Sequence, residues 1–293
     1  MNTQRRIIIV GASGLVGRNL TALLQKQGDV VVPLSLRGQP LTDAQKSVLE
    51  NAYAVINLAG APIAQRWTTT HQQSIFSSRV ATTQHLAQAL AELKARPHCF
   101  ISMSGINRYG YRRPNEVLQE NSAVGAEGFL TEVCQAWETA TLPAAQAGIR
   151  TVLLRTGVVL AASGGALAQM LLPFKLGMGG PIGTGAQKFS WIRLGDLTAL
   201  ISWLLTQENI QGPINATAPK PLSQHEFARA LGQALHRPSF LPLPTFMVKL
   251  IWGKMGQETL LADLAVLPQV ALTHGFNFTT PTIETALPLA LKE

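Results

Sequence analysis

The stretch Ile7-Ile-Ile-Val-Gly-Ala-Ser-Gly-Leu-Val-Gly17 decides the fold. Its β-branched run ends at a glycine, and from Leu15 apolar residues recur at helical spacing as far as Gly28. The stretch therefore predicts a buried strand, a tight turn and a helix. Glycines at positions 11, 14 and 17 give the turn a G-x-x-G-x-x-G pattern.

This turn has the properties of a dinucleotide-binding site. The first glycine permits the tight turn, the second lets the backbone approach a pyrophosphate, and the third lets the helix pack close to the strand. The helix N-terminus adds free N–H groups and a partial positive charge. A glycine triplet alone is weak evidence, but this one lies between a strand and a helix, as the motif requires. We predict that the phosphates contact Gly11, Ser13, Gly14, Leu15, Val16 and Gly17.

The residues after the second predicted strand, 30–34, favour a phosphorylated nucleotide. An NAD-binding chain carries Asp or Glu about 20 residues after the glycines, where the carboxylate accepts hydrogen bonds from a ribose 2′-hydroxyl. This chain has Arg37 there, and a guanidinium pairs with a 2′-phosphate instead. NADP(H) is therefore favoured over NAD(H), with a solvated loop arginine as the alternative role for Arg37.

The rest of the chain repeats the strand and helix pattern. Short apolar segments at 54–58, 99–103 and 151–154 alternate with helical stretches, which predicts a parallel sheet covered on both faces. We expect an α/β, doubly wound parallel sheet of the Rossmann type with a smaller C-terminal substrate lobe. The glycine-rich segment 177–185 is typical of a loop that closes over a substrate. The dinucleotide-binding domain is expected at 1–156, with 192–218 returning to it, and the lobe at 157–293.

Composition narrows the class of protein. Among 293 residues, apolar runs such as 199–205 are far shorter than the ~20 residues that a bilayer requires, so no membrane partner is expected. The net charge of +8 is dispersed and lacks an aromatic-interleaved basic stripe, so no nucleic-acid partner is expected. Two cysteines and six histidines without ligand spacing indicate neither a disulfide framework nor a metal site. The N-terminus lacks a signal-peptide pattern, which predicts a cytoplasmic protein.

Further segments resemble the extended short-chain dehydrogenase/reductase superfamily of nucleotide-sugar epimerases and dehydratases. The resemblance covers nearly the whole chain and narrows to an atypical branch called epimerase family proteins, of the YfcH-like and 39U types. It implies an NAD(P)-binding epimerase or oxidoreductase, and it adds Leu58, Ala59, Gly60, Arg79 and Ser102 to the expected cofactor contacts. Arg79 could instead be a solvated arginine. The segments that carry the resemblance are Gly11–Gly17, Asn57-Leu-Ala-Gly60, Arg66-Trp67, Tyr109-Gly110, Arg155-Thr-Gly-Val-Val-Leu160 and Trp191-Ile-Arg-Leu-Gly-Asp196.

The catalytic pair of the typical superfamily is missing. Its members use a Tyr-x-x-x-Lys pair, in which the lysine lowers the pKa of the tyrosine. This chain has Phe129 and Val133 in that frame. Ser104 and Tyr109 are the remaining candidates for catalysis, and Arg108 is expected to lower the pKa of Tyr109. Tyr109 could equally be a packed loop aromatic.

Two functions therefore remain open. One is an NADP(H)-dependent oxidoreductase or epimerase acting on a small anionic or carbonyl-bearing substrate; the other is a non-catalytic dinucleotide sensor, for example of cell division. The missing pair favours the sensor, whereas the closing loop and full substrate lobe favour the enzyme, which is our leading hypothesis. Glu138 is expected to cap local structure or to form an ion pair, and Asp196 is expected to cap a helix. The chain is expected to be a monomer or a homodimer.

Overall fold

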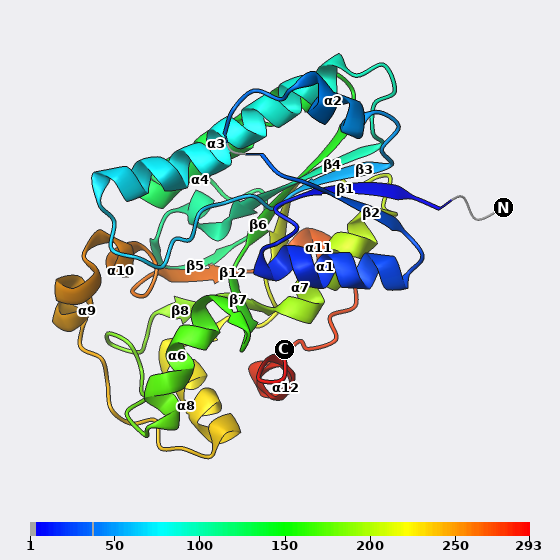
Figure 1. The fold of residues 1–293 in the computed structure, drawn as a ribbon. Coiled ribbons are helices and arrows are strands. Elements are labelled where there is room, and N and C mark those ends of the chain that lie inside the picture. The colour runs from blue at the N-terminus through cyan, green and yellow to red at the C-terminus, as the bar shows by residue number, and fades with distance from the viewer. Residues whose placement is uncertain (1–3, 37) are drawn as a thin grey trace.

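The computed structural model describes residues 4–36 and 38–293, and a six-stranded sheet lies at its centre (Figure 1). The strand order is β10-β6-β4-β3-β1-β2, and every neighbouring pair is parallel. The predicted Rossmann-type α/β fold is therefore confirmed. The strands are β1 (Arg6–Val10), β2 (Val30–Leu34), β3 (Ala54–Asn57), β4 (Cys99–Gly105), β6 (Arg150–Thr156) and β10 (Gly212–Ala216).

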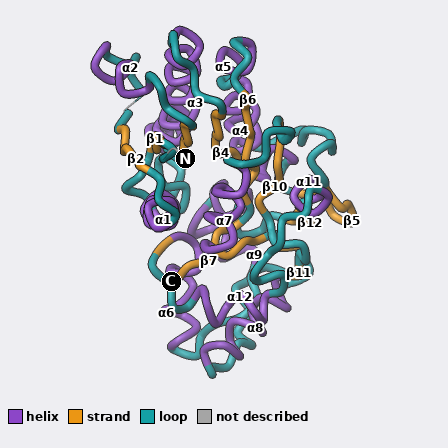
Figure 2. The backbone as a smooth tube through the Cα atoms, turned by 90° about the vertical axis from the view of Figure 1, so that its right-hand side faces the viewer, coloured by secondary structure: helices purple, strands orange, loops and turns teal. Residues whose placement is uncertain are grey.

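The sheet is covered on both faces, which explains the unbroken apolar run in β1. Ile7 and Ile9 point to one face, and Ile8 and Val10 to the other, because side chains alternate along a strand. Figure 2 shows the sheet between the two groups of helices. One face carries α1 (Leu15–Lys26) and α7 (Leu194–Leu204); the other carries α2 (Asp43–Leu49), α3 (Thr69–Glu92), α4 (Phe129–Thr139) and α5 (Leu142–Gln146).

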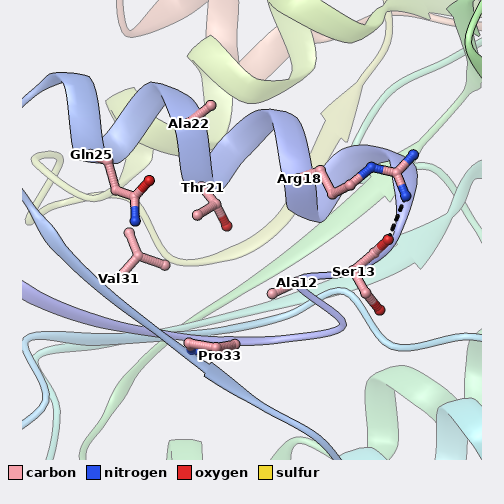
Figure 3. Close-up of a pocket in the computed structure, with 8 residues that line it drawn as sticks. All are labelled: Ala12, Ser13, Arg18, Thr21, Ala22, Gln25, Val31 and Pro33. Carbon is pink, nitrogen blue, oxygen red and sulfur yellow. Dashed lines mark hydrogen bonds between the residues drawn. The ribbon is translucent and has the colours of Figure 1, made fainter.

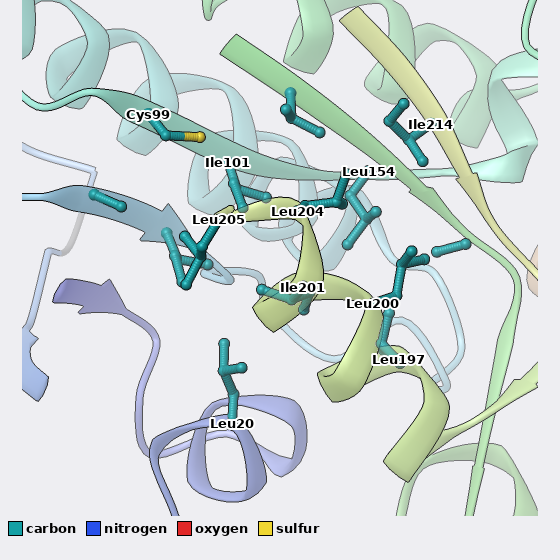
Figure 4. Close-up of a cluster of buried hydrophobic side chains, with 14 of the residues drawn as sticks. Leu20, Cys99, Ile101, Leu154, Leu197, Leu200, Ile201, Leu204, Leu205 and Ile214 are labelled. Atoms are coloured by element: carbon teal, nitrogen blue, oxygen red, sulfur yellow. The ribbon is translucent and has the colours of Figure 1, made fainter. Parts of the chain in front are cut away.

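The core beneath α1 and α7 holds these helices against the strands (Figure 4). Its side chains are mostly aliphatic and almost fully buried, and each of the larger ones contributes roughly 1.5–3 kcal/mol of burial free energy. This packing fixes α1 at a defined distance from β1 and so fixes the turn between them. The labelled members of this core include Leu20, Ile101, Leu154, Leu197, Leu200, Ile201 and Ile214.

The winding of the sheet reverses between β1 and β3. From β2 at the edge, the chain passes back over β1 to form β3 on its other side. Ligands of doubly wound sheets bind at such a switch point, outside the carboxyl ends of the strands. The loops that follow β1 and β3 therefore lie where a ligand is expected.

The chain after Gly157 builds a third core, and three small sheets lie outside the central one among the described residues. β7 pairs with β9, β8 with β11, and β5 with β12. The third core joins α6, α8 and α12, while α9 and α10 lie at one end of the molecule (Figure 1). The remaining elements are η1 (Ile106–Tyr109), β5 (Arg112–Leu118), β7 (Val158–Ala161), α6 (Gly165–Lys175), β8 (Lys188–Phe189), β9 (Trp191–Arg193), β11 (Leu222–Ser223), α8 (Gln224–Leu235), α9 (Thr245–Trp252), α10 (Lys254–Glu258), β12 (Asp263–Val266), α11 (Gln269–Thr273) and α12 (Ile283–Ala290).

One local expectation is wrong. Asp196 does not cap α7, because that helix begins at Leu194 and the cap position is Arg193. The Asp196 carboxylate lies inside the first turn and accepts hydrogen bonds from the backbone N–H groups of Thr279 and Thr280. It therefore ties residues 279–280 of the C-terminal region to the start of α7. Separately, no helix within the described residues combines the length and the apolar character needed to cross a bilayer.

Candidate functional site

The three glycines of the β1–α1 turn differ in how much space surrounds them. Gly11 has φ +84° and lies against the loop after β3, where a Cβ would come within 2.9 Å of the Leu58 carbonyl carbon. At Gly17 a Cβ would lie 2.3 Å from the Gly11 carbonyl oxygen, so α1 packs too closely on the turn for any side chain. Gly14 has room within the protein, because its nearest neighbour would be the Gly11 oxygen at 3.4 Å.

The N-terminus of α1 is available to an anion. Gly14 is the cap residue, no side chain of the described residues caps this end, and the first turn carries no acidic residue. The N–H groups and positive end of the helix dipole thus lack an internal acceptor. The residues predicted to bind phosphate, from Gly11 through Ser13 to Gly17, form this turn.

Arg18 adds a cation that the sequence analysis missed. Its guanidinium donates a 2.8 Å hydrogen bond to the Ser13 carbonyl oxygen and stays exposed beside the turn (Figure 3). The same two residues line a surface pocket that extends between α1 and β2. The signal for Arg18 was a basic residue directly after the third glycine. The pocket is completed by Ala12, Thr21, Ala22, Gln25, Val31 and Pro33.

The loop after β3 is held by a buried amide. The Asn57 side chain accepts a hydrogen bond from the Ala59 N–H and donates one to the Thr83 hydroxyl at 2.7 Å. These bonds fix the backbone of Leu58, Ala59 and Gly60 beside the turn. Ser102 lies next to Asn57 in the sheet and is buried, so its hydroxyl does not reach the surface. Arg37 lies outside the described residues.

Arg79 is a buried cation at this same loop. Its guanidinium donates to the carbonyl oxygens of Ala61 and Ile75 and lies 5.3 Å from the centre of the Trp137 ring. Burial lowers the pKa of Arg79. None of the ion pairs among the described residues includes it. Because a buried charge without a partner is costly, this position suits an anionic ligand.

The predicted catalytic serine belongs to a buried ion-pair network. Ser104 donates a 2.9 Å hydrogen bond to the Glu138 carboxylate, which also pairs with Arg108 at 3.0 Å and Arg155 at 2.8 Å. Glu138 does form the expected ion pair. Two guanidinium groups share this one carboxylate at the carboxyl end of β4, and the buried carboxylate of Glu120 lies beside the same cluster, where it accepts a hydrogen bond from the Asn215 N–H at 3.0 Å.

Tyr109 lies inside the same network. It has no exposed surface, and its hydroxyl donates to Asn215 at 2.8 Å and accepts a hydrogen bond from Arg155 at 2.9 Å. Burial raises the pKa of Tyr109, and the favourable charge of Arg155 does not overcome that effect. The prediction that Arg108 lowers this pKa is wrong, because the Arg108 guanidinium is directed at Glu138 instead. A direct role of Tyr109 in proton transfer stays a prediction.

The frame that usually holds the catalytic pair is apolar in this chain. Phe129 is the first residue of α4, and its ring packs edge to face on Trp67 at 5.1 Å. Val133 is buried one turn later. The Glu258 carboxylate accepts hydrogen bonds from the N–H groups of Phe129 and Leu130, at 3.0 and 2.9 Å. A carboxylate from the C-terminal region therefore fixes the start of this helix.

Two family models match the chain. That of the NAD dependent epimerase/dehydratase family covers residues 7–216, and that of a domain of unknown function, DUF1731, covers 243–288. Epimerase family protein SDR39U1 of Bos taurus is 37% identical over 96% of this chain and 98% of its own length. Epimerase family protein YfhF of Bacillus subtilis is 34% identical over 96% of each chain.

Solved structures agree with these sequence matches. The structure of human SDR39U1 with NADPH superposes with a TM-score of 0.90 and 33% identity, covering 98% of this chain and 99% of the human one. A nucleoside-diphosphate sugar epimerase from Corynebacterium glutamicum has a TM-score of 0.77 and 31% identity, covering 98% of this chain and 59% of the other. Both similarities extend through the turn, the sheet and the C-terminal region.

Proposed function

The chain belongs to the NAD dependent epimerase/dehydratase family, and on this premise we propose that it binds NADP(H) at the β1–α1 turn. It then acts as an oxidoreductase or epimerase on a small anionic or carbonyl-bearing substrate. The observation that carries the proposal is the uncapped, glycine-framed N-terminus of α1 at the switch point of the sheet. The NADPH in the human relative's structure supports the choice of nucleotide.

The residues present fit this cofactor. The turn from Gly11 to Gly17 would hold the pyrophosphate, and Gly14 leaves room for its close approach. Arg37 would bind the 2′-phosphate, as its place in the sequence indicates, with Arg18 as a second cation near the turn. Leu58, Ala59 and Gly60 would border the cofactor from the loop after β3. The positive charge of Arg79 would be balanced by an anionic group of the cofactor or substrate.

A bound nicotinamide would supply hydride to a carbonyl carbon or, in the reverse direction, accept hydride from the corresponding alcohol carbon. The chain's own contribution is the network at the end of β4. Glu138 orients the Ser104 hydroxyl, and Arg155 together with Asn215 fixes the Tyr109 hydroxyl. Ser104 and Tyr109 are our proposed catalytic residues. With its pKa raised, Tyr109 would hold its proton at neutral pH and could act only as an acid, after a shift of the network exposes it.

A non-catalytic sensor is the second candidate, and specific observations favour it. Phe129 and Val133 cannot exchange protons, and both remaining hydroxyl groups already have partners within the protein. In that case NADP(H) would bind and the readout would pass to a protein partner. For either candidate we propose a cytoplasmic protein that binds a small molecule and is a monomer or a homodimer. Its nucleotide-binding part would comprise residues 1–156 and 192–218, beside a lobe within 157–293.

Turnover separates the two candidates. The purified chain is incubated with NADPH and a panel of small aldehydes and ketones, and nicotinamide absorbance is followed. We expect slow oxidation that Tyr109→Phe abolishes, while Tyr111→Phe, in the same loop, retains it. Oxidation that survives Tyr109→Phe would contradict the catalytic assignment. Tight NADPH binding without oxidation by any carbonyl would favour the sensor.

A further inference from the structure

Large apolar side chains gather on the surface at one end of the molecule. Phe240 is 73% exposed, Phe246 68% and Leu250 74%. Soluble surfaces rarely present several such residues side by side without a binding partner. We call this surface the apolar end; it comprises Leu176, Met178, Phe240, Phe246, Leu250 and Ile251.

Backbone contacts join the segments of the apolar end into one surface. The segments 177–183 and 237–243 run side by side, since Leu241 donates its N–H to the Gly179 carbonyl and Leu243 donates to that of Pro181. A Cβ on Gly180 would come within 2.0 Å of the Leu241 carbonyl oxygen, so the two segments touch directly. Helix α9 begins directly after the segment 237–243, with Pro244 as its cap residue. The segments that carry the apolar end are therefore contiguous: two lie side by side, and the helix continues from one of them.

Helix α9 presents most of its apolar side chains to solvent. Only Val248 is fully buried. Phe246 and Leu250 are four residues apart, as are Met247 and Ile251, so the two pairs form adjacent rows on one side of the helix. Figure 1 shows α9 and α10 at the extremity of the molecule. The helix is thus placed to lie flat on another surface with its apolar side inward.

The charges within the segments that form the apolar end have one sign. The segments 165–183 and 237–257 contain no Asp or Glu, and they carry Lys175, Arg237, Lys249 and Lys254. All four of these cations are exposed. The next acidic residue, Glu258, is buried and occupied by the N–H groups of Phe129 and Leu130. The surface therefore combines exposed apolar side chains with four cations that take part in none of the ion pairs among the described residues.

We propose that the apolar end docks on an anionic lipid surface, with the apolar side of α9 in the interface and the surrounding cations at the lipid headgroups. Long basic side chains such as Lys249 suit this arrangement, because their stems bury while their charges reach the headgroups. A second copy of the chain fits less well: a two-fold interface would bring the same cations face to face without an acid to pair them. The expectation of no membrane partner rested on the lack of a spanning segment, and a helix lying on the surface needs none.

The test is cosedimentation of the full-length chain with lipid vesicles. We expect the wild type to pellet with mixed phosphatidylglycerol and phosphatidylcholine vesicles and not with phosphatidylcholine alone, and the bound fraction to fall as salt rises. Leu250→Glu and the double variant Lys249→Glu/Lys254→Glu should each lower the apparent affinity at least about tenfold. Leu142→Glu is the matched control, since Leu142 is 47% exposed in α5, outside the apolar end.

Three outcomes would overturn the proposal. The first is no wild-type binding to anionic vesicles. The second is equal binding by wild type and Leu250→Glu, with circular dichroism showing that both are folded. The third is a dimer in light scattering that Leu250→Glu dissociates, together with no vesicle binding, which would assign the apolar end to a second copy. Because the readout is lipid binding, none of these outcomes depends on the NADP(H) proposal.

Discussion

Two substitutions in the β1–α1 turn separate cofactor approach from helix packing. At Gly17 an added Cβ would lie 2.3 Å from the Gly11 oxygen and 2.7 Å from the Ala12 Cα, whereas ordinary contact begins at 3.4 Å. These are backbone atoms, so the turn would have to open by about 1 Å, at an overpacking cost of about 1–3 kcal/mol. At Gly14 the closest atom would be 3.4 Å away, and φ is −72°, which alanine adopts readily.

We therefore expect Gly14→Ala and Gly17→Ala to fail in different ways. Gly14→Ala should keep the wild-type free energy of unfolding to within roughly 1 kcal/mol, the cost of alanine at a cap position. Its methyl group would occupy the space that the pyrophosphate needs, so NADPH affinity should fall at least about tenfold, or about 1.4 kcal/mol. Gly17→Ala should lose both stability and affinity.

Urea unfolding followed by circular dichroism measures the stability of both variants, and nicotinamide fluorescence measures NADPH affinity. The informative variant is Gly14→Ala, because its fold should be intact. If Gly14→Ala bound NADPH as tightly as the wild type, the phosphates would not approach the turn at Gly14, and the reasoning would be refuted.

Other substitutions test the buried charges and thiols. Glu138→Gln should lower the free energy of unfolding by about 3–5 kcal/mol, because the Arg155 guanidinium would stay buried without its carboxylate; a loss under about 1 kcal/mol in urea unfolding would contradict this. Arg79→Met should leave the free energy of unfolding nearly unchanged or raise it, since the Arg79 charge has no carboxylate partner among the described residues. The same variant should bind NADPH more weakly in the fluorescence titration. Unchanged NADPH binding would exclude Arg79 from the site. Burial raises the pKa of Cys134 to about 11, so the native thiol should resist alkylation by iodoacetamide near pH 9, about its ordinary pKa, and react once unfolded. The stability that comes from keeping this thiol protonated is present below about pH 9 and is lost as the pH rises through 11, so unfolding should become easier over that range.

The sheet could be predicted because its strands carry local signals. Ile7 to Val10 is apolar at every position and ends at a glycine, as a strand buried on both faces does. Helix limits were harder. The stretch 124–147 predicts a helix with an interruption at Pro143 as an alternative. The structure has two helices, α4 and α5, with Pro143 in the first turn of α5, and α4 begins only after Gly128 at φ +120°. Likewise a helical pattern over 244–266 is divided at Gly253 and ends in β12.

The candidate site, like the fold, can be predicted from the sequence only in part. The turn from Gly11 to Gly17 is contiguous in the sequence, so its spacing alone indicated its use. The Glu138 network joins side chains from β4, η1, α4, β6 and β10, and no spacing rule brings such distant segments together. For this reason the sequence indicates the adjacent Arg108 as the partner of Tyr109, whereas in the structure Arg155 from β6 takes that place. The sequence also does not indicate that α9 is exposed, because a helix with many apolar residues is normally buried.

The most direct test of the central claim is a titration of the wild type and of Arg37→Ala with NADPH and with NADH, followed by nicotinamide fluorescence. We expect the wild type to bind NADPH at least about tenfold more tightly than NADH, and Arg37→Ala to bind NADPH only as weakly as NADH. Wild-type protein that binds neither nucleotide would contradict the claim that the β1–α1 turn is a dinucleotide site. Tighter binding of NADH than of NADPH would contradict the choice of cofactor.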